Sequence, residues 1–392
     1  MADVERVKQQ VADEVERRAD MLVEASHEIH SRPELCYEER FASGLLASMC
    51  EAEGLEVERP AYGLDTAFVA RAGDGEGPTV AVLSEYDALP GIGHACGHNV
   101  IATSGAGAGA ALAAIRNQLP KGRVHVIGTP AEEGGGGKIK LIKAGLFKDV
   151  DAAMMIHGFD RTLLHQDLLG IARATFEFTG KASHASADPW EGINALDACV
   201  QTYNAVAMLR QQVRPDCRIH GIITSGGAAA NIIPESASAI FYVRAPGIDT
   251  MWDLYRRVVA CAEGAAKAAG CGLTVTPHES IYEPMKSSRV LLDLFAANMV
   301  STGLKEGAPI PDRKGSSDVG NVSQILPTIQ PMIGIAPEGM AIHTRDFAEA
   351  AVQPLARQGM VAAAKTMAMT TYDLLADPGR VKAAKEEFAH GR

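Results

Sequence analysis

Hydrophobic and polar positions in the first 160 residues follow two alternating patterns, short apolar runs and longer amphipathic stretches. The apolar runs predict strands over 65–71, 78–84, 124–130 and 152–158, and the amphipathic or small-residue stretches predict helices over 4–30, 38–53 and 99–119. The Ala- and Gly-rich composition of 99–119 favours a helix that packs closely on a sheet. Buried strands alternating with helices indicate an α/β fold whose mostly parallel sheet is covered on both faces.

Near residue 169 the pattern changes to strands with one exposed face. In chain order it predicts a strand over 172–182, a helix over 192–213, strands over 219–227 and 236–245, a helix over 251–270 and a strand over 271–280. This order is that of a complete two-layer α+β unit. Beyond residue 285 the buried pattern returns, with a predicted strand over 326–335 and a long helix over 346–375.

The simplest organisation is one α/β domain interrupted by a smaller inserted domain. We predict a first domain built from residues 1–168 and 285–392, with residues 169–284 as the insertion. Insertion is tolerated where the two ends of the inserted segment lie close together.

Composition narrows the class of protein. The 392 residues are enough for two domains, and 47% apolar with 22% charged residues is ordinary for a globular protein. A net charge of -11 argues against nucleic acid and anionic membranes as partners. Seven cysteines without disulfide-framework spacing, and an N-terminus that resembles an amphipathic helix rather than a signal peptide, predict reduced thiols in the cytoplasm.

The segment SEYDALPGIGHACGHN, residues 84–99, gathers candidate metal ligands around a Pro-Gly turn. It brings His94, Cys96 and His98 within five residues, with Asp87 just upstream. Thiolate and imidazole together suit a borderline transition metal. The segment alone is weak evidence, because a free Cys is commonly a small buried hydrophobe.

Three later places add polar residues after buried strands. Glu132 and Glu133 precede four glycines, His157 closes the run AAMMIHG, and His343 follows a loop with Gly and Pro. Each of these has an ordinary explanation when taken singly. The two glutamates would form a solvated acidic turn, and each histidine would be a structural residue with its hydrogen bonds satisfied. Open α/β sheets place their sites at the carboxyl ends of strands, so all of these residues are expected at one edge. The expected ligands are Cys96, His98, Glu133, His157 and His343.

This set predicts metal-assisted hydrolysis. A bound metal lowers the pKa of water and polarises a carbonyl, while Glu132 remains available as a general base. Asp87 suits a supporting role that orients a ligand imidazole. Two alternatives stay open: a thiol hydrolase using Cys96 with His98, which are poorly spaced as nucleophile and base, and a non-catalytic metal or small-molecule binding protein.

The inserted domain offers weaker candidates. His184 lies in a polar loop before a helix, and Asn231 and Arg244 lie near predicted strand ends. Asn231 and Arg244 could bind a substrate carboxylate, Arg244 in bidentate fashion, or could equally be a turn residue and a surface charge.

Six motifs in order resemble one enzyme family. IHSRPELCYEE, DALPGIGHACGHN, PAEEGGGGK, GKASHAS, NIIPE and IHT span nearly the whole chain. They resemble the aminoacylase/carboxypeptidase family of dinuclear metallopeptidases, in the amidohydrolase branch of auxin-amide, hippurate and aminobenzoyl-glutamate hydrolases and Xaa-Arg or β-alanyl-lysine dipeptidases. The implied substrate is a small N-acyl amino acid, aryl amide or dipeptide.

The resemblance also implies roles for individual residues. It implies two divalent ions, with Mn²⁺ favoured over Zn²⁺, Co²⁺ or Ni²⁺, held by the five ligands above. Glu132 is implied as the general base, and His184 as an oxyanion-stabilising residue that reaches into the partner's site of a homodimer or higher oligomer. Asn231 resembles a substrate contact from an inserted lid and dimerisation domain.

The chain departs from the family pattern at two places. Asn99 stands where many relatives have Asp, which removes a negative charge near the expected metals. Glu85-Tyr86-Asp87 stands where Asp-Met-Asp is common. Both departures resemble the dipeptidase and aminobenzoyl-glutamate side of the branch.

Overall fold

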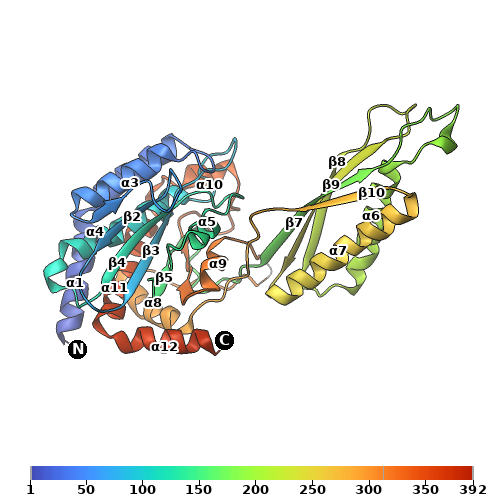
Figure 1. Cartoon of the computed structure of the whole chain (residues 1–392). Helices are drawn as coiled ribbons and strands as arrows, with labels where there is room; N and C mark the ends of the chain where they lie inside the picture. The colour runs from blue at the N-terminus through green and yellow to red at the C-terminus, as the bar shows by residue number, and fades with distance from the viewer. Residues whose placement is uncertain (1, 312, 391–392) are drawn as a thin grey trace. The chain divides into compact units, whose positions relative to one another are not determined.

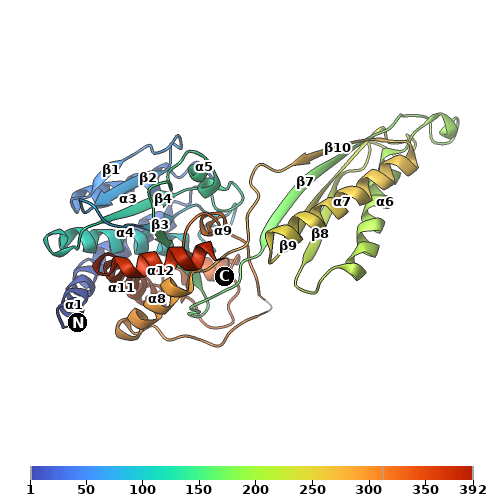
Figure 2. The ribbon, with the colours of Figure 1, turned by 60° about the horizontal axis from the view of Figure 1, so that its bottom comes forward.

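The computed structural model describes residues 2–311 and 313–390, and the chain divides into two compact units. The first unit comprises Met1–Gln166, Lys286–Arg313 and Asn321–Arg392, and the second comprises Asp167–Met285 with Lys314–Gly320. Each unit has its own sheet and its own helices (Figures 1 and 2).

The first unit is built on a six-stranded sheet in the order β1-β2-β4-β3-β5-β11. Its strands are β1 (Glu56–Glu58), β2 (Phe68–Ala72), β3 (Thr79–Glu85), β4 (Arg123–Thr129), β5 (Ala152–Met154) and β11 (Thr328–Ile329). The neighbours β4, β3, β5 and β11 pair in parallel, while β1 and β2 add antiparallel. The strands β6 (His157–Phe159) and β12 (Met332–Gly334) form a separate parallel pair. The expected mostly parallel α/β sheet is confirmed.

Helices surround this sheet. They are α1 (Ala2–Arg17), α2 (Ala19–Ser31), α3 (Arg40–Ala52), α4 (His98–Ala114), α5 (Gly137–Lys143), α8 (Arg289–Thr302), α10 (Arg345–Ala350), α11 (Pro354–Ala376) and α12 (Pro378–Ala389). The division between the two units falls within α9 (Val319–Ser323). Helix α4 packs along β3 and β4, and its small residues make this possible. A Cβ on Gly105 would lie 2.4 Å from Ser84 Oγ, and one on Gly109 would lie 2.0 Å from Val126 Cγ2.

Several predicted elements are interrupted in the structure. The strand predicted over 152–158 is two strands, β5 and β6, and the strand predicted over 326–335 is β11 and β12, separated at Gln330 and Pro331. Pro331 has no N–H to donate to a ladder, so the run breaks there. The helix predicted over 346–375 is α10 and α11, because Pro354 starts a new helix. The helix predicted over 4–30 turns at Arg18, and α8 and α12 were not predicted.

The second unit is a four-stranded antiparallel sheet in the order β10-β7-β9-β8. Its elements are β7 (Gly170–Thr179), α6 (Ala195–Leu209), β8 (Arg218–Ser225), β9 (Ser236–Ala245), α7 (Ile248–Ala269) and β10 (Gly272–Pro277). Helices α6 and α7 pack on the sheet around buried Phe176, Phe178 and Phe241. The order strand-helix-strand-strand-helix-strand is the one expected from the sequence.

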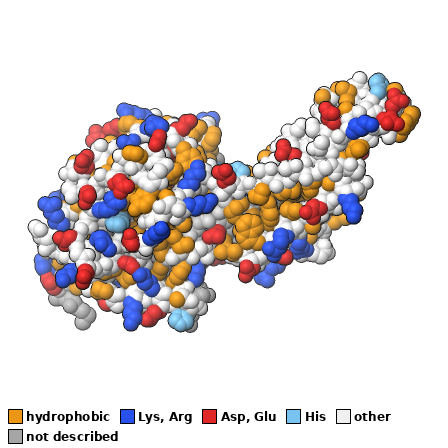
Figure 3. All heavy atoms as spheres, in the orientation of Figure 1, with side chains coloured by type: hydrophobic (Ala, Val, Ile, Leu, Met, Phe, Trp, Pro, Cys, Tyr) orange, Lys and Arg blue, Asp and Glu red, His pale blue; other side chains and the backbone are white. Residues whose placement is uncertain are grey.

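No helix among the described residues combines the length and hydropathy needed to cross a membrane. Acidic and basic side chains are interspersed on the face of the first unit shown in Figure 3, and neither sign forms a continuous stripe there.

Candidate metal centre and active site

Parallel strands of the first unit bring two distant loops together at the carboxyl edge of the sheet. Strand β3 ends at Glu85 and β4 ends at Thr129, and these two residues are paired in register. The loops that follow them, 86–97 and 130–136, therefore leave the sheet side by side. His157 opens β6, and its N–H donates to Pro331 O at 2.9 Å.

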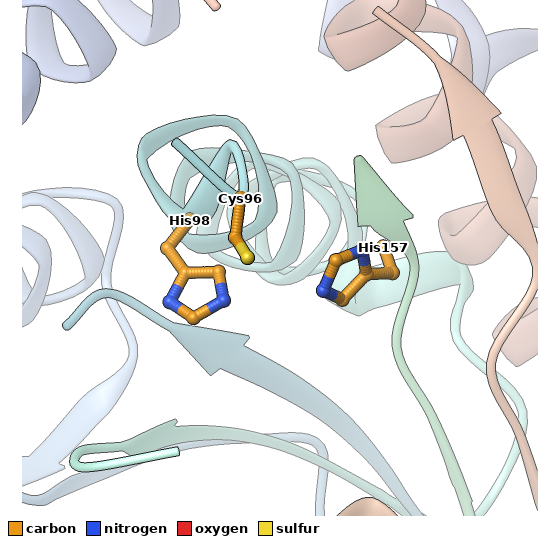
Figure 4. A group of neighbouring side chains, drawn as sticks. All are labelled: Cys96, His98 and His157. Atoms are coloured by element: carbon orange, nitrogen blue, oxygen red, sulfur yellow. The ribbon is translucent and has the colours of Figure 1, made fainter. Parts of the chain in front are cut away.

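A left-handed residue sets the spacing of Cys96 and His98. Gly97, with φ 75°, is the N-cap of α4, so Cys96 lies before the helix and His98 is its first residue. A Cβ on Gly97 would lie 2.4 Å from Ile335 Cδ1, which leaves no room for another residue in this conformation. Both side chains approach His157 of β6 (Figure 4).

Two buried carboxylates hold the turn that carries Glu132 and Glu133. Ala131 has φ 63°, and its N–H donates to Glu39 Oε1 at 2.9 Å. The N–H of Glu133 donates to Asp87 Oδ2 at 2.8 Å. Hydrogen bonds from the backbone N–H groups on both sides of Glu132 thus fix this turn. Glu132 itself is buried, with 6% of its surface exposed.

The expected ligand side chains converge in two overlapping groups. Donor atoms of Cys96, His98 and His157 lie within 4.8 Å of one another, and so do those of Cys96, Glu133 and His343. Cys96 belongs to both groups, which suits a thiolate shared between two ions. His343, with φ 62°, is tied to the first loop because its N–H donates to Ala95 O at 2.9 Å.

Two buried carboxylates, Glu85 and Asp87, lie beside the His98 ring. Burial works against a charged imidazole, but Glu85 and Asp87 outweigh it and raise the pKa of His98 well above its ordinary value. His98 Nδ1 faces Asp87 O at 2.7 Å and Asp87 Oδ1 at 3.2 Å. Burial opposes the Asp87 carboxylate, yet His98 and the Glu133 N–H lower its pKa. The Asp87 carboxylate and backbone oxygen thus both lie beside Nδ1 of His98, and an orienting role for Asp87 stays a prediction.

Burial favours the uncharged forms of His157 and Cys96, the other two donors of the first group. Desolvation lowers the pKa of His157 to about 4, and it raises the pKa of Cys96 well above its ordinary value. A neutral imidazole has the lone pair that a metal needs. The pKa of the Cys96 thiol stays raised even with His98 beside it, which argues against the thiol-hydrolase alternative, since the nucleophile there would be a thiolate.

Unsatisfied buried atoms show that this donor set fits a metal. Among the described residues, His98 Nε2, Glu133 Oε1 and Glu85 Oε1 accept or donate no hydrogen bond although all three are buried. His98 Nε2 lies 3.2 Å from Glu85 Oε1 and 4.0 Å from Glu133 Oε1. Buried polar atoms without partners are costly, and a divalent cation between them would satisfy all three.

The sequence interpretation missed three residues of this edge. Glu85 is the last residue of β3, Lys138 lies in the first turn of α5, and Glu39 precedes α3; all are fully buried. Glu85, His98 and Glu132 form a further group whose donor atoms lie within 4.8 Å. An acidic residue closing an apolar strand was a visible signal for Glu85. The burial of Lys138 had no signal in the sequence.

His94 and Asn99 lie outside these ligand groups. His94 packs beside His30 with ring centroids 6.1 Å apart, and burial lowers its pKa to about 3. Asn99 Nδ2 donates to Ser26 Oγ at 2.9 Å and to Ala351 O at 3.0 Å. An Asp could not donate to either acceptor, so the Asn99 amide links α4 to α2 and to the residue that follows α10.

In the second unit, two of the candidate residues are neighbours. His184 and Ile232 form a β-bridge, and Ala185 N donates to Asn231 O at 3.0 Å. His184 and Asn231 are both exposed. His184 Nδ1 accepts from the N–H groups of Ser186 at 3.3 Å and Ala187 at 3.2 Å. The neutral ring therefore carries its proton on Nε2, which makes that atom a donor.

The structure does not bring Arg244 to the same place. It lies at the far end of β9, next to the residue that pairs with Gly170, whereas Ser236 at the start of β9 pairs with Thr179. Nine residues of strand separate the two ends, roughly 30 Å. Arg244 Nη1 donates to Ser316 Oγ at 2.9 Å, and its Nε lies 3.3 Å from His220 Nε2. Arg244 and Asn231 thus do not form one carboxylate site within this unit.

Comparison with known proteins identifies the family of the chain. The profile of Peptidase family M20/M25/M40 matches residues 81–363. The chain is 38% identical to a mouse Xaa-Arg dipeptidase over 99% of this chain and 93% of the relative, and 29% identical to a p-aminobenzoyl-glutamate hydrolase polypeptide of Escherichia coli over 96% and 94%. A dinuclear metal-binding peptidase of family M20 from Bacillus subtilis shares the fold, with a TM-score of 0.71, 20% identity and coverage of 92% and 99%.

The chain therefore belongs to peptidase family M20/M25/M40. Within that family it is an enzyme, a metal-dependent hydrolase of amide bonds, as the motifs indicated.

Proposed function

We propose that the protein hydrolyses a small dipeptide or N-acyl amino acid, using two divalent ions held by Cys96, His98, Glu133, His157 and His343. The observation that carries the proposal is the convergence of these side chains from four separate segments at one sheet edge. Glu132, at the same edge but in neither of the two ligand groups that share Cys96, is the proposed general base.

The residues around the ions have distinct tasks. When bound, the ions would lower the pKa of the attacking water and would polarise the carbonyl of the scissile bond. Glu132 accepts a proton from that water and returns it to the departing nitrogen. Asp87 keeps His98 oriented through Nδ1, and Glu39 and Asp87 hold the turn on both sides of Glu132.

The mouse relative named Xaa-Arg dipeptidase makes a dipeptide the first substrate class to test. The E. coli relative named for aminobenzoyl-glutamate supports an acyl or aryl amide of an amino acid as the second. For the ions we favour Mn²⁺, because the carboxylates Glu85, Glu132 and Glu133 belong to the donor groups at this edge and carboxylate oxygen suits a hard ion. Zn²⁺, Co²⁺ and Ni²⁺ are the alternatives that thiolate and imidazole would accept.

We further propose a cytoplasmic homodimer formed through the second unit. Strand β8 is an edge strand that pairs only with β9 among the described strands, and it exposes Ile222 and Ile223. Helix α6 carries exposed Val200 and Met208 on the face away from the sheet. An unprotected, apolar strand edge is a template for pairing with another chain. In the dimer, the Nε2–H of His184 would stabilise the oxyanion in the partner's site, with Asn231 beside it contacting the substrate.

A panel experiment tests the proposed function. Metal-depleted protein would be reloaded with Mn²⁺ or Zn²⁺ and incubated with dipeptides ending in Arg or Lys, aminobenzoyl-glutamate and N-acyl amino acids. We expect release of a free amino acid that a chelator abolishes and metal restores. Undiminished hydrolysis after exhaustive metal removal would contradict the metal-dependent mechanism. The same panel decides against a non-catalytic binding protein if any substrate turns over.

A further inference from the structure

Glu85 and Lys138 form a buried ion pair against the metal-binding edge. Glu85 ends β3, Lys138 lies in the first turn of α5, and both side chains are fully buried. The Lys138 ammonium contacts Glu85 Oε2. A buried ion pair carries a large desolvation cost, and its two charges depend on each other, since removing one would leave the other uncompensated.

The second oxygen of Glu85 points into the donor cluster. Oε1 lies 3.2 Å from His98 Nε2, closer than the 4.0 Å between that nitrogen and Glu133 Oε1. Neither Glu85 Oε1 nor His98 Nε2 makes a hydrogen bond to any described residue. Two atoms that bind one ion at about 2.1 Å lie roughly 3 Å apart, so the spacing suits shared coordination.

A simple hydrogen bond does not join these two atoms. They face each other across 3.2 Å, yet neither has a hydrogen-bond partner among the described residues. Glu85, His98 and Glu132 each offer a donor atom within 4.8 Å of the others. A cation between Nε2 and Oε1 would satisfy both atoms.

We infer that Glu85 is a further metal-facing carboxylate of this site and that Lys138 is the positioning residue that holds it there. This rests on the proposed metal-dependent function. By occupying Oε2, Lys138 leaves one oxygen of Glu85 for an ion. The carboxylate oxygen biases the site toward a hard ion such as Mn²⁺ over Zn²⁺.

The test removes the pair as a unit. Changing one partner would leave an uncompensated buried charge, so the informative variant is Glu85→Gln with Lys138→Met. Titration of metal-free protein with Mn²⁺ and Zn²⁺, followed by calorimetry and by elemental analysis of bound metal, should give native affinity for one ion. The affinity for the other Mn²⁺ should fall at least tenfold, and the Zn²⁺ affinity should fall less.

A matched control is the buried pair of Lys8 and Asp373, 3.3 Å apart on α1 and α11. The variant Lys8→Met with Asp373→Asn should keep both metal affinities. If the Glu85/Lys138 double variant does not fold, Glu85→Asp withdraws the same oxygen with its charge kept, and a weakened absorption change on Co²⁺ binding is expected.

Different results would overturn the role of Glu85 and the metal-dependent function of the protein. Native affinities for both Mn²⁺ ions in a folded Glu85 variant would overturn the role of Glu85 and leave the proposed function intact. A native protein that binds no stoichiometric metal would overturn the proposed function itself.

Discussion

The metal-facing edge of the first unit and the His184–Asn231 loops of the second differ in how they hold functional side chains. At the edge, Glu39 and Asp87 are buried and bind backbone N–H groups of the turn around Glu132. In the second unit, His184 and Asn231 are exposed, and neighbouring backbone bonds hold their loops. The first region is preorganised by burial. The second leaves its side chains exposed, so the roles proposed for His184 and Asn231 depend on a substrate or a partner chain that covers them.

The largest expected effect is a loss of catalytic rate when Glu132, in the turn at the edge of the sheet, is changed. Glu132→Gln should lower kcat by about 10³-fold, because general acid-base catalysis contributes 10²–10⁴-fold and Gln cannot accept the proton. Metal content, measured by elemental analysis, should remain native. A variant that retains its full rate would show that another group serves as the base.

The next largest effect is a loss of rate when His184, in the exposed loop of the second unit, is changed. It tests whether His184 serves the active site of a partner protomer. His184→Ala should lower kcat by roughly 10²-fold, the typical loss for one oxyanion donor, with metal content unchanged. Mixing this variant with Glu132→Gln under conditions that exchange protomers should recover about a quarter of native activity, because half of the dimers would then contain one intact site. Recovery of nothing in a verified mixed dimer would place His184 in the site of its own protomer.

Glu39 offers a pH test of the buried edge. Desolvation, reinforced by Asp87, raises the pKa of Glu39 to about 7. A raised carboxyl pKa means that the folded protein holds the proton while the unfolded chain has lost it, so stability falls as pH rises from about 4.5 through 7. The free energy of unfolding should drop by on the order of 2 kcal/mol between about pH 5 and 7 from this group alone.

The matched variant is Glu39→Gln, which keeps an oxygen for the N–H groups of Tyr37 and Ala131 but cannot ionise. Urea unfolding at several pH values should show a flatter profile than that of the native protein. The same slope in both proteins would contradict the assigned pKa.

The smallest effect is expected at Asp87. Asp87→Asn removes the charge that supports His98, yet the backbone Asp87 O still faces Nδ1 and the new amide oxygen can accept from Glu133 N–H. Metal affinity should fall about tenfold, the lower end of the range for residues that support a ligand. Calorimetric titration measures this, and unchanged affinity would limit Asp87 to holding the turn.

Much of the fold was predictable, and the failures have local causes. The strand-helix order of both units follows from periodicity, since buried and half-exposed strands leave different patterns. The breaks at Pro331 and Pro354 went unpredicted because an apolar run and a helical period continue across them. The candidate ligands were predictable because each follows a buried strand or a Gly-rich turn.

The sequence by itself determined which donor types exist and that most of them lie at strand ends, through residue identity and the parallel sheet that the pattern implies. Only the tertiary structure decided that Glu85 and Lys138 are buried together beside His98, and that Arg244 lies at the other end of β9 from the residues near Asn231. Burial and distance arise from the packing of segments far apart in the chain, and no local pattern encodes them.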